Sequence, residues 1–207
     1  MLAARKDYMT FPDHLPIVAP ADSVLGPGQG NWTYKEYANL SDDGNHYEVV
    51  DGVLFMTPSP GSEHQSAVGE IFAYLREHIK LRGLGKVFFA PLDVELAQNV
   101  IVQPDIIVIL NDNRKKITHS RIIGSPDLLI EVVSPGSVGY DRREKQNSYA
   151  RAGVAEYWIV DPLAQNVELL ILEAETYRSE GVFQGKSTLP SRVVHEFAVP
   201  VESFFLA

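Results

Sequence analysis

The chain has 207 residues, of which 45% are hydrophobic and 22% are charged, values typical of a globular protein and far from those of a disordered chain. This length favours one domain with extensions over two domains. The sequence has no cysteine and a net charge of −9, which excludes disulfides, thiolate metal sites and a broad basic surface for nucleic acid.

The first 45 residues are rich in proline and glycine, which predicts an extended arm. One short helix is expected within it. Thr33 and Glu36 have the spacing of a capping box, in which two side chains satisfy the free amides of a first helical turn, and this helix should run to about Leu40. Residues 47–56 then place Asp51-Gly52 between two β-prone runs. This pair predicts a hairpin, which we expect at the edge of the fold.

A long amphipathic helix is predicted next. Ser62 and Gln65 have capping-box spacing, and apolar residues recur at helical intervals as far as Ile79, before Gly83 and Gly85 end the pattern. Three apolar runs of strand length follow the glycines: residues 87–96, 101–110 and 128–133. Residues 97–99 have the composition of a hairpin turn between the first two runs.

A second helix and a fourth strand complete the predicted core. Asp141 and Glu144 form a third capping pattern, which predicts a helix from Arg142 to Ala152 that ends at Gly153. The later apolar segments are residues 156–160, 167–172, 177–183 and 199–205. From Ser62 onward the order is therefore helix, three strands, helix, strand, so we expect a mixed α/β fold.

Two acidic residues lie within runs that otherwise favour burial. Asp105 follows Pro104 in the second strand segment, and Glu131 lies within the third. A carboxylate with apolar neighbours on both sides is costly to bury unless it is paired, hydrogen-bonded or bound to a metal. If the two strands are neighbours, both carboxylates can share one hard cation such as Mg²⁺ or Mn²⁺. Lys145, on the following helix, can bring an ammonium group to the same place.

The sequence resembles a known family at this point. The blocks that carry the resemblance are residues 103–105, 126–135, 141–153 and 156–162. They are similar to a bacterial domain-of-unknown-function family of putative restriction endonucleases, which belongs to the PD-(D/E)XK nuclease superfamily. The resemblance extends from about Tyr47 to Leu170. It implies a restriction-endonuclease-like core of helix, three strands, helix and strand, the order inferred above from the residues.

The resemblance also implies roles for individual residues. Asp105 takes the place of the first acid and Glu131 that of the second, both as metal ligands, with the Val132 carbonyl as a third ligand. The chain departs from the motif at its lysine, which is Val133 here. The resemblance implies that Lys145 replaces that lysine from the helix. Glu48 resembles an additional acid found near such sites, as a further ligand or as a group that positions water.

Histidines offer a weaker set of candidates. The six His residues include no pair at ligand spacing such as i, i+4, which argues against a histidine zinc site. His64, at the start of the long helix, is placed where it could approach the cleft, although a capping or surface role is more common. Five basic residues are candidate phosphate contacts: Lys80, Arg82, Lys86, Arg142 and Arg143.

The sequence thus predicts a metal-dependent endonuclease that uses Mg²⁺ or Mn²⁺ and acts on nucleic acid, most simply DNA. The alternative is a nuclease-like module that binds nucleic acid or protein without cutting. We expect residues 1–45 to form the arm, 46–173 the nuclease domain and 174–207 a C-terminal extension of it. The apolar arm and terminal segment favour a homodimer. Without an apolar run of about 20 residues or a signal peptide, we expect a cytoplasmic protein with no membrane association.

Overall fold

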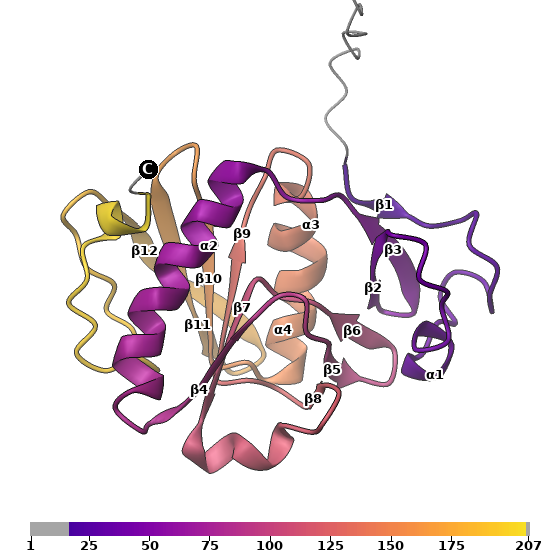
Figure 1. Cartoon of the computed structure of the whole chain (residues 1–207), viewed down its shortest axis with the longest axis horizontal. Helices are drawn as coiled ribbons and strands as arrows, with labels where there is room; N and C mark the ends of the chain where they lie inside the picture. Colours follow the sequence, from indigo (N-terminus) through magenta and orange to yellow (C-terminus); the bar gives the residue numbers. More distant parts are fainter. Residues whose placement is uncertain (1–16, 206–207) are drawn as a thin grey trace, which may run out of the picture.

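The computed structural model describes residues 17–205, so residues 1–16 of the predicted arm lie outside the described part. Two six-stranded sheets form the scaffold (Figure 1). The main sheet has the order β12-β11-β10-β9-β7-β4: its strands are β4 (Gly85–Phe89), β7 (Ile106–Leu110), β9 (Leu128–Val132), β10 (Glu156–Asp161), β11 (Asn166–Glu173) and β12 (Thr176–Gln184). The second sheet has the order β1-β3-β2-β6-β5-β8: its strands are β1 (Ala19–Pro20), β2 (His46–Val50), β3 (Val53–Thr57), β5 (Val94–Ala97), β6 (Val100–Val102) and β8 (Ile122–Ile123).

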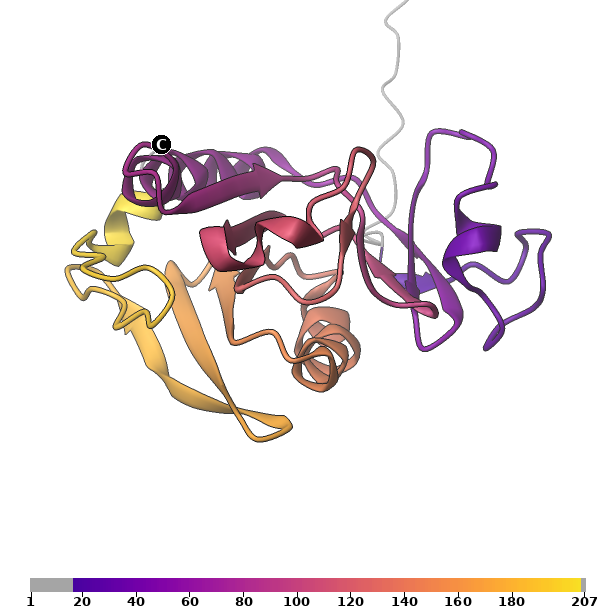
Figure 2. The same ribbon diagram turned by 90° about the horizontal axis from the view of Figure 1, so that it is seen from below.

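Helices cover the two faces of the main sheet (Figure 2). α2 (Ser62–Leu75) continues through a π-helical segment, Arg76–Lys80, and packs on one face. On the other face, α3 (Val138–Tyr140), a π-helical segment (Asp141–Lys145) and α4 (Gln146–Ala152) form one continuous helical stretch. The shorter helices are α1 (Tyr34–Tyr37) and the 3₁₀ segments Asn111–Lys116 and Val201–Phe205. Among residues 17–205, no helix combines the length and apolar composition needed to span a bilayer.

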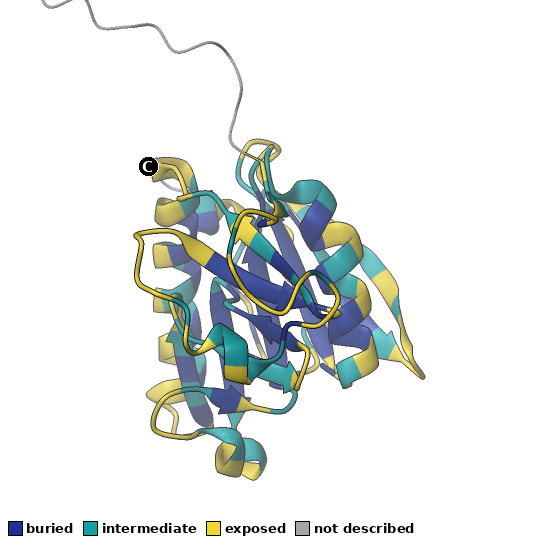
Figure 3. Cartoon of the chain, turned by 90° about the vertical axis from the view of Figure 1, so that its right-hand side faces the viewer, coloured by how far each residue is buried: buried dark blue, intermediate teal, exposed yellow. Residues whose placement is uncertain are grey.

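The central strands are mostly apolar because both of their faces are covered, and Glu131 and Glu156 are the buried exceptions. Ile130 points toward α2, whereas Leu129 points toward α4, as expected from the two-residue period of a strand. These strands lie in the most buried part of the molecule (Figure 3). Glu131 has the same parity as Leu129 and therefore lies on the α4 side, within the core.

The predicted core order is confirmed, with β4, β7 and β9 as the three strands and β10 as the fourth. β4, β7 and β9 are antiparallel neighbours, whereas β10 runs parallel to β9. The hairpin at Asp51-Gly52 is also confirmed, because β2 and β3 pair across it and both turn residues have positive φ. Within the second sheet the hairpin has a neighbouring strand on each side, since β2 pairs with β6 and β3 pairs with β1.

The first two predicted core strands are wrong in one respect, because each is two strands. Residues 87–96 divide into β4 in the main sheet and β5 in the second sheet, with Pro91 between them. Residues 101–110 divide in the same way into β6 and β7 at Pro104. A proline has no amide to donate to a ladder, so the chain leaves one sheet there and enters the other. The residues 97–99 turn does join β5 to β6 as a hairpin.

Two of the three predicted capping boxes are wrong. Thr33 and Glu36 do form the expected box at α1. α2, however, is capped at Gly61, which places Ser62 inside the helix. The second helical stretch begins after Ser137, so that Asp141 lies within it, buried and facing Lys145 one turn later. Its predicted end is confirmed, since Gly153 adopts the left-handed conformation of a C-cap.

The chain segments outside the core also pack on it. Trp32 is 2% exposed and belongs to an apolar cluster with strands of the second sheet. The Val18 amide donates to the Gly136 carbonyl at 3.1 Å, which connects the segment before β1 to the loop before α3. At the other end, Val201 and Phe204 are fully buried in the main core. Among the described residues, Trp32, Val201 and Phe204 are therefore covered within the chain, whereas Ile17 and Leu25 of the arm are exposed.

Candidate functional site

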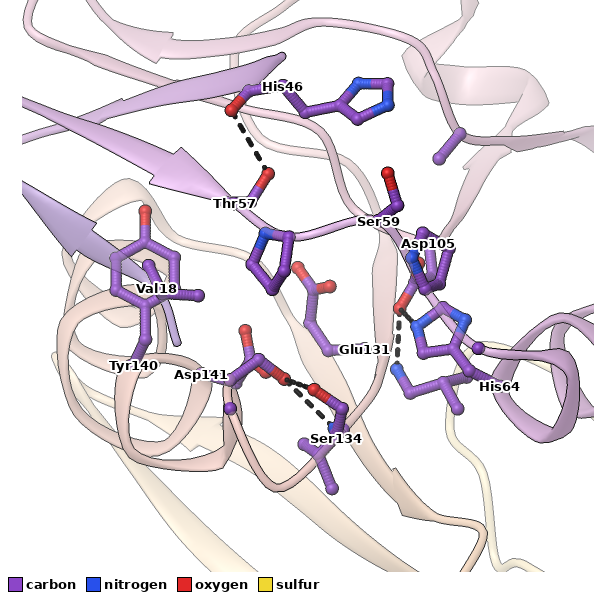
Figure 4. Close-up of a pocket in the computed structure, with 18 of the residues that line it drawn as sticks. Val18, His46, Thr57, Ser59, His64, Asp105, Glu131, Ser134, Tyr140 and Asp141 are labelled. Carbon is purple, nitrogen blue, oxygen red and sulfur yellow. Dashed lines mark hydrogen bonds and ion pairs between the residues drawn. The ribbon is translucent and has the colours of Figure 1, made fainter. Parts of the chain in front are cut away.

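A cleft of about 680 Å³ opens between the two sheets (Figure 4). Its floor is the end of β9, and its walls are the start of α2, the loop before α3 and the start of β2. Every residue predicted for the site lines it: Glu48, Asp105, Glu131, Val132 and Lys145. His64, Tyr140 and Asp141 line it as well.

Asp105 is held at the beginning of β7 by the break in the strand at Pro104. One carboxylate oxygen, Oδ2, accepts a hydrogen bond from the Val132 amide at 2.8 Å and lies 3.1 Å from His64 Nε2. Ile106 pairs with Ile130, so the same antiparallel register brings Asp105 level with Glu131. The two acids that the sequence placed on consecutive strands are therefore neighbours at one end of the sheet.

Glu131 and Lys145 form a buried ion pair. Lys145 Nζ lies 3.0 Å from Glu131 Oε1, and the hydroxyl of Tyr149 donates to the same oxygen at 2.5 Å. Glu131 is 3% exposed and Lys145 is 5% exposed. Lys145 reaches Glu131 because the helical stretch from α3 to α4 packs on this face of the sheet. Residues 145 and 149 are four apart, about one helical turn, so both side chains lie on the side that faces Glu131.

Two further carboxylates surround the same ammonium group. Lys145 Nζ lies 2.9 Å from Glu48 Oε1 and 3.7 Å from Asp141 Oδ1. Glu48 comes from β2 of the second sheet, and its Oε1 also accepts from the Gln103 amide at 2.6 Å. Lys145 therefore joins carboxylates from both sheets and from its own helix.

Burial and excess negative charge dominate the electrostatics of this cluster. Burial raises the pKa of Glu131 well above its ordinary value, and the neighbouring acids raise it further, although Lys145 opposes this. Burial likewise raises the pKa of Asp141 to about 6. Burial alone would lower the pKa of Lys145, but Glu131, Glu48 and Asp141 together raise it well above its ordinary value. The ammonium group therefore stays charged, and it is outnumbered by its acidic partners.

A hard divalent cation fits this donor set. Among residues 17–205, Asp105 Oδ1 and Glu131 Oε2 accept no hydrogen bond, and Val132 adds backbone to the same wall. The described residues contain no ready-made cluster of three or more acidic or histidine ligands. Mg²⁺ does not need one, since it is commonly held by one or two carboxylates, with water and phosphate completing its coordination. An added cation would also offset the excess of buried negative charge.

Sequence reasoning missed three residues of the cleft or its support. Asp141 was interpreted as a helix cap, although its spacing of four from Lys145 was a signal for a pair on one helix face. Tyr140 and Tyr149 carried no signal distinct from that of core aromatics. His64 does approach the cleft, where its Nε2 contacts Asp105.

The five basic residues expected to contact phosphate do not line the cleft. Lys80 ends the helical stretch that begins with α2 and lies 18 residues after Ser62, about 27 Å away by helical rise, and Arg82 and Lys86 follow it in the turn and in β4. Arg142 instead forms an ion pair with Glu168, and Arg143 donates to the Gly139 carbonyl. Any phosphate contact by these five side chains would therefore lie outside the cleft, and such contacts stay a prediction.

Comparisons with known proteins agree with this geometry. The family model Uma2, described as a putative restriction endonuclease, matches residues 34–202. A crystal structure of a putative nuclease belonging to DUF820, from Anabaena variabilis ATCC 29413, superposes with a TM-score of 0.71. The two chains are 20% identical, and the match covers 84% of this chain and 97% of the other, which shows a shared fold. A search of curated proteins finds no match.

Proposed function

Because the chain belongs to the Uma2 family of putative restriction endonucleases, we propose that it is a metal-dependent endonuclease that hydrolyses phosphodiester bonds in DNA. One observation carries this proposal: Asp105, Glu131, Glu48 and Lys145 converge in a single cleft from two sheets and a helix. Two carboxylates beside a fixed ammonium group suit a reaction at a phosphate ester.

Asp105 and Glu131 are the proposed ligands of Mg²⁺ or Mn²⁺, with the Val132 carbonyl as a third ligand. When bound, the cation neutralises the charge of a phosphodiester and makes water more acidic. The protein fixes its own groups for this purpose. The Val132 amide and His64 hold one oxygen of Asp105, and Tyr149 and Lys145 hold one oxygen of Glu131, so each acid keeps its other oxygen for a ligand.

Lys145 is the proposed replacement for the lysine of the family motif. Its ammonium group is charged and is held at about 3 Å by Glu48 and Glu131, which fixes its position before substrate arrives. A positioned donor of this kind stabilises the negative charge that develops on phosphate oxygens. Glu48 in turn positions the ammonium group from the second sheet.

The proposal is tested with Asp105→Asn and Glu131→Gln, assayed for nicking of plasmid DNA with Mg²⁺, with Mn²⁺ and with a chelator. Both variants should lose cleavage while remaining folded, because each change keeps the size of the side chain and removes its charge. Asp112→Asn and Glu175→Gln are matched controls, since both acids are exposed and lie outside the cleft. Unchanged cleavage by either cleft variant would rule out this mechanism. A parallel assay on RNA of the same sequence tests the choice of DNA.

The alternative is a module that binds nucleic acid or protein without cutting. The acidic cleft favours it, because the described lining carries five acids against one lysine: Glu48, Glu63, Asp105, Glu131 and Asp141. Calorimetry with Mn²⁺ separates the two functions. The endonuclease should bind Mn²⁺ with a heat that disappears in Asp105→Asn and Glu131→Gln, whereas a binding module has no need of that metal.

The homodimer also stays a prediction. Of the apolar residues described in these two segments, Trp32 and Phe204 are covered within the chain, whereas Ile17 and Leu25 are exposed. Sedimentation at several protein concentrations measures the association directly.

A further inference from the structure

Positive charge gathers in two segments of the chain that lie away from the cleft. Residues 76–86 and 111–116 together contain seven basic residues and two acidic ones, whereas the whole chain has a net charge of −9. The first segment runs from the π-helical end of the α2 stretch through a turn into β4, and the second is the 3₁₀ segment after β7. A local excess of five positive charges is therefore set in an otherwise strongly acidic protein.

Backbone contacts hold the two segments side by side. The amide of Asn111 donates to the Leu84 carbonyl at 3.0 Å, and its side-chain amide donates to the Gly83 carbonyl at 2.7 Å. Gly85 pairs with Leu110 where β4 begins, and the 3₁₀ segment lies beside this strand (Figure 2). Six cations therefore share one surface, which we call the distal basic patch: Arg76, Lys80, Arg82, Lys86, Arg114 and Lys115.

The cations of the distal basic patch have no acidic partner. Five of the six are exposed and Lys86 is partly exposed, and within residues 17–205 none of them forms an ion pair or a side-chain hydrogen bond. Arginines elsewhere in the chain behave differently, since five of them pair with acids: Arg121, Arg142, Arg151, Arg178 and Arg192. Like charges repel one another, so a patch left unpaired in a chain rich in acids indicates an anionic partner.

A nucleic-acid backbone suits this patch better than a single small anion. The six side chains are long and are spread over a helix end, a strand and a 3₁₀ segment, which matches a row of phosphates. The cleft cannot supply this attraction by itself, because its described lining carries five acids against one lysine. A duplex whose scissile phosphate enters the cleft therefore needs cations elsewhere on the protein.

The distance between the patch and the cleft suits a single duplex. β4 starts at the patch, and Ala90 and Pro91, which follow it directly, line the cleft. The five residues of β4 span about 17 Å, and the helical path from Ser62 to Lys80 spans about 27 Å. At about 3.4 Å per base pair, these lengths correspond to about five to eight base pairs.

We propose that the distal basic patch binds the phosphate backbone of duplex DNA, about five to eight base pairs from the phosphate that enters the cleft. The choice of DNA and the relation to the cleft rest on the proposed function. The patch itself does not depend on the chemistry of the cleft. It joins Lys80, Arg82 and Lys86 to cations from a second segment that follows a different strand.

Lys80→Gln combined with Lys115→Gln tests the patch, with one change in each segment. Binding of a fluorescent duplex of about 20 base pairs is measured by anisotropy, with a chelator present and salt varied from about 50 to 200 mM. We expect Kd to rise at least about tenfold at the lowest salt, and the slope of log Kd against log salt to fall by about 1.8, because each phosphate contact contributes about 0.9.

Lys35→Gln combined with Lys186→Gln is the matched control. It removes the same charge from two exposed lysines that lie outside the patch and the cleft and form no ion pair within residues 17–205. Its Kd should stay within about twofold of the wild type, and urea unfolding should show that both double variants are folded. Equal effects of the two double variants would mean that only net charge matters and would overturn the inference. Tighter binding of a polyglutamate peptide at the patch would assign it to an acidic protein and would overturn it too.

Nicking of plasmid DNA separates this inference from the proposed function. The double variant of the patch should raise KM more than it lowers kcat, since the patch contacts DNA far from the reacting phosphate. A protein that binds duplex DNA through the patch but cleaves none would refute the proposed function and keep the patch. A protein that cleaves DNA, and whose patch variant binds the duplex as the wild type does, would refute this inference alone.

Discussion

Glu131 and Glu156 are buried glutamates on neighbouring strands, and their surroundings differ sharply. Glu156, fully buried, accepts at Oε1 from Trp158 Nε1 and Ser191 Oγ, each at 2.6 Å. Its Oε2 accepts from the amides of Arg192 at 2.7 Å and Val193 at 3.2 Å. Glu131, by contrast, accepts from described residues at one oxygen only, and one of these donors is the charged Lys145.

This difference distinguishes a structural acid from a candidate functional one. Glu156 attaches the segment after β12 to β10, and its capacity to accept hydrogen bonds is filled by the protein. Glu131 lies at an open cleft with an oxygen left over and too few positive charges nearby. Burial alone therefore does not identify a site. The informative feature is a buried carboxylate with one oxygen that no protein donor contacts, so that a ligand can bind there.

Glu131→Gln should give the largest change. We expect cleavage to fall at least about 100-fold, because a neutral amide no longer attracts a cation. Unfolding stability should hardly decrease, since Lys145 keeps Glu48 and Asp141 as partners. Cleavage rates and urea unfolding of the same preparation measure both effects. A large loss of stability would mean that Glu131, like Glu156, is mainly structural.

Glu156→Ala should have the opposite profile. It leaves four donors without an acceptor, two of them on the buried residues Trp158 and Val193, so the free energy of unfolding should fall by about 3 to 5 kcal/mol. Urea unfolding measures the loss, with the exposed Glu175→Ala as control, for which a change within about 0.5 kcal/mol is expected. Cleavage per folded molecule should match the wild type. A selective loss of cleavage would show that the two glutamates are not separate in function.

Asp141→Asn should change how stability depends on pH. Because the folded-state pKa of Asp141 is raised to about 6 from 3.8, the favourable contribution is present below pH 3.8 and is lost as the pH rises through 6. The variant should equal the wild type near pH 4 and be more stable at pH 7.5, by on the order of 1 to 3 kcal/mol. Urea unfolding from pH 4 to 7.5 tests this. Parallel curves for the two proteins would contradict it.

Ser191→Ala and Tyr149→Phe should give the smallest changes. Each removes one hydroxyl donor, from Glu156 and from Glu131 respectively, and each should cost about 1 kcal/mol of stability. Only Tyr149→Phe should also slow cleavage, because it loosens a proposed ligand. Equal effects of the two variants on cleavage would remove the distinction between the two glutamates.

The sequence indicated much of the fold because the signals were local and repeated. The helix through Ile79 showed clear periodicity, and β9 and β10 were continuous apolar runs between turn residues. The division of two strands at Pro91 and Pro104 was not predicted. Each long apolar run was interpreted as one continuous strand, although it contains a proline. Which sheet a segment joins depends on distant partners, which a linear pattern does not contain.

The candidate site was indicated to a similar extent. Asp105 and Glu131 were conspicuous because acids are rare in buried strands, and the structure brings both to one cleft with Lys145 and Glu48. Their chemical roles remain predictions. Asp141 was misinterpreted because a helix cap and an i, i+4 ion pair have similar spacing. Tyr140 could not be found, because its position beside the cleft depends on three-dimensional packing and not on composition.

The contact between Glu48 of the second sheet and Lys145 beside the main sheet bears on which part of the chain holds the proposed catalytic groups. The six-element core begins at Ser62, but Glu48 belongs to β2, and the amide that holds it belongs to Gln103, after β6. A shortened protein that kept only the core order would retain Asp105, Glu131, Asp141 and the lysine, yet it would lose the carboxylate of Glu48 that contacts the lysine from the second sheet. The proposed catalytic groups therefore extend beyond the six-element core, into the second sheet.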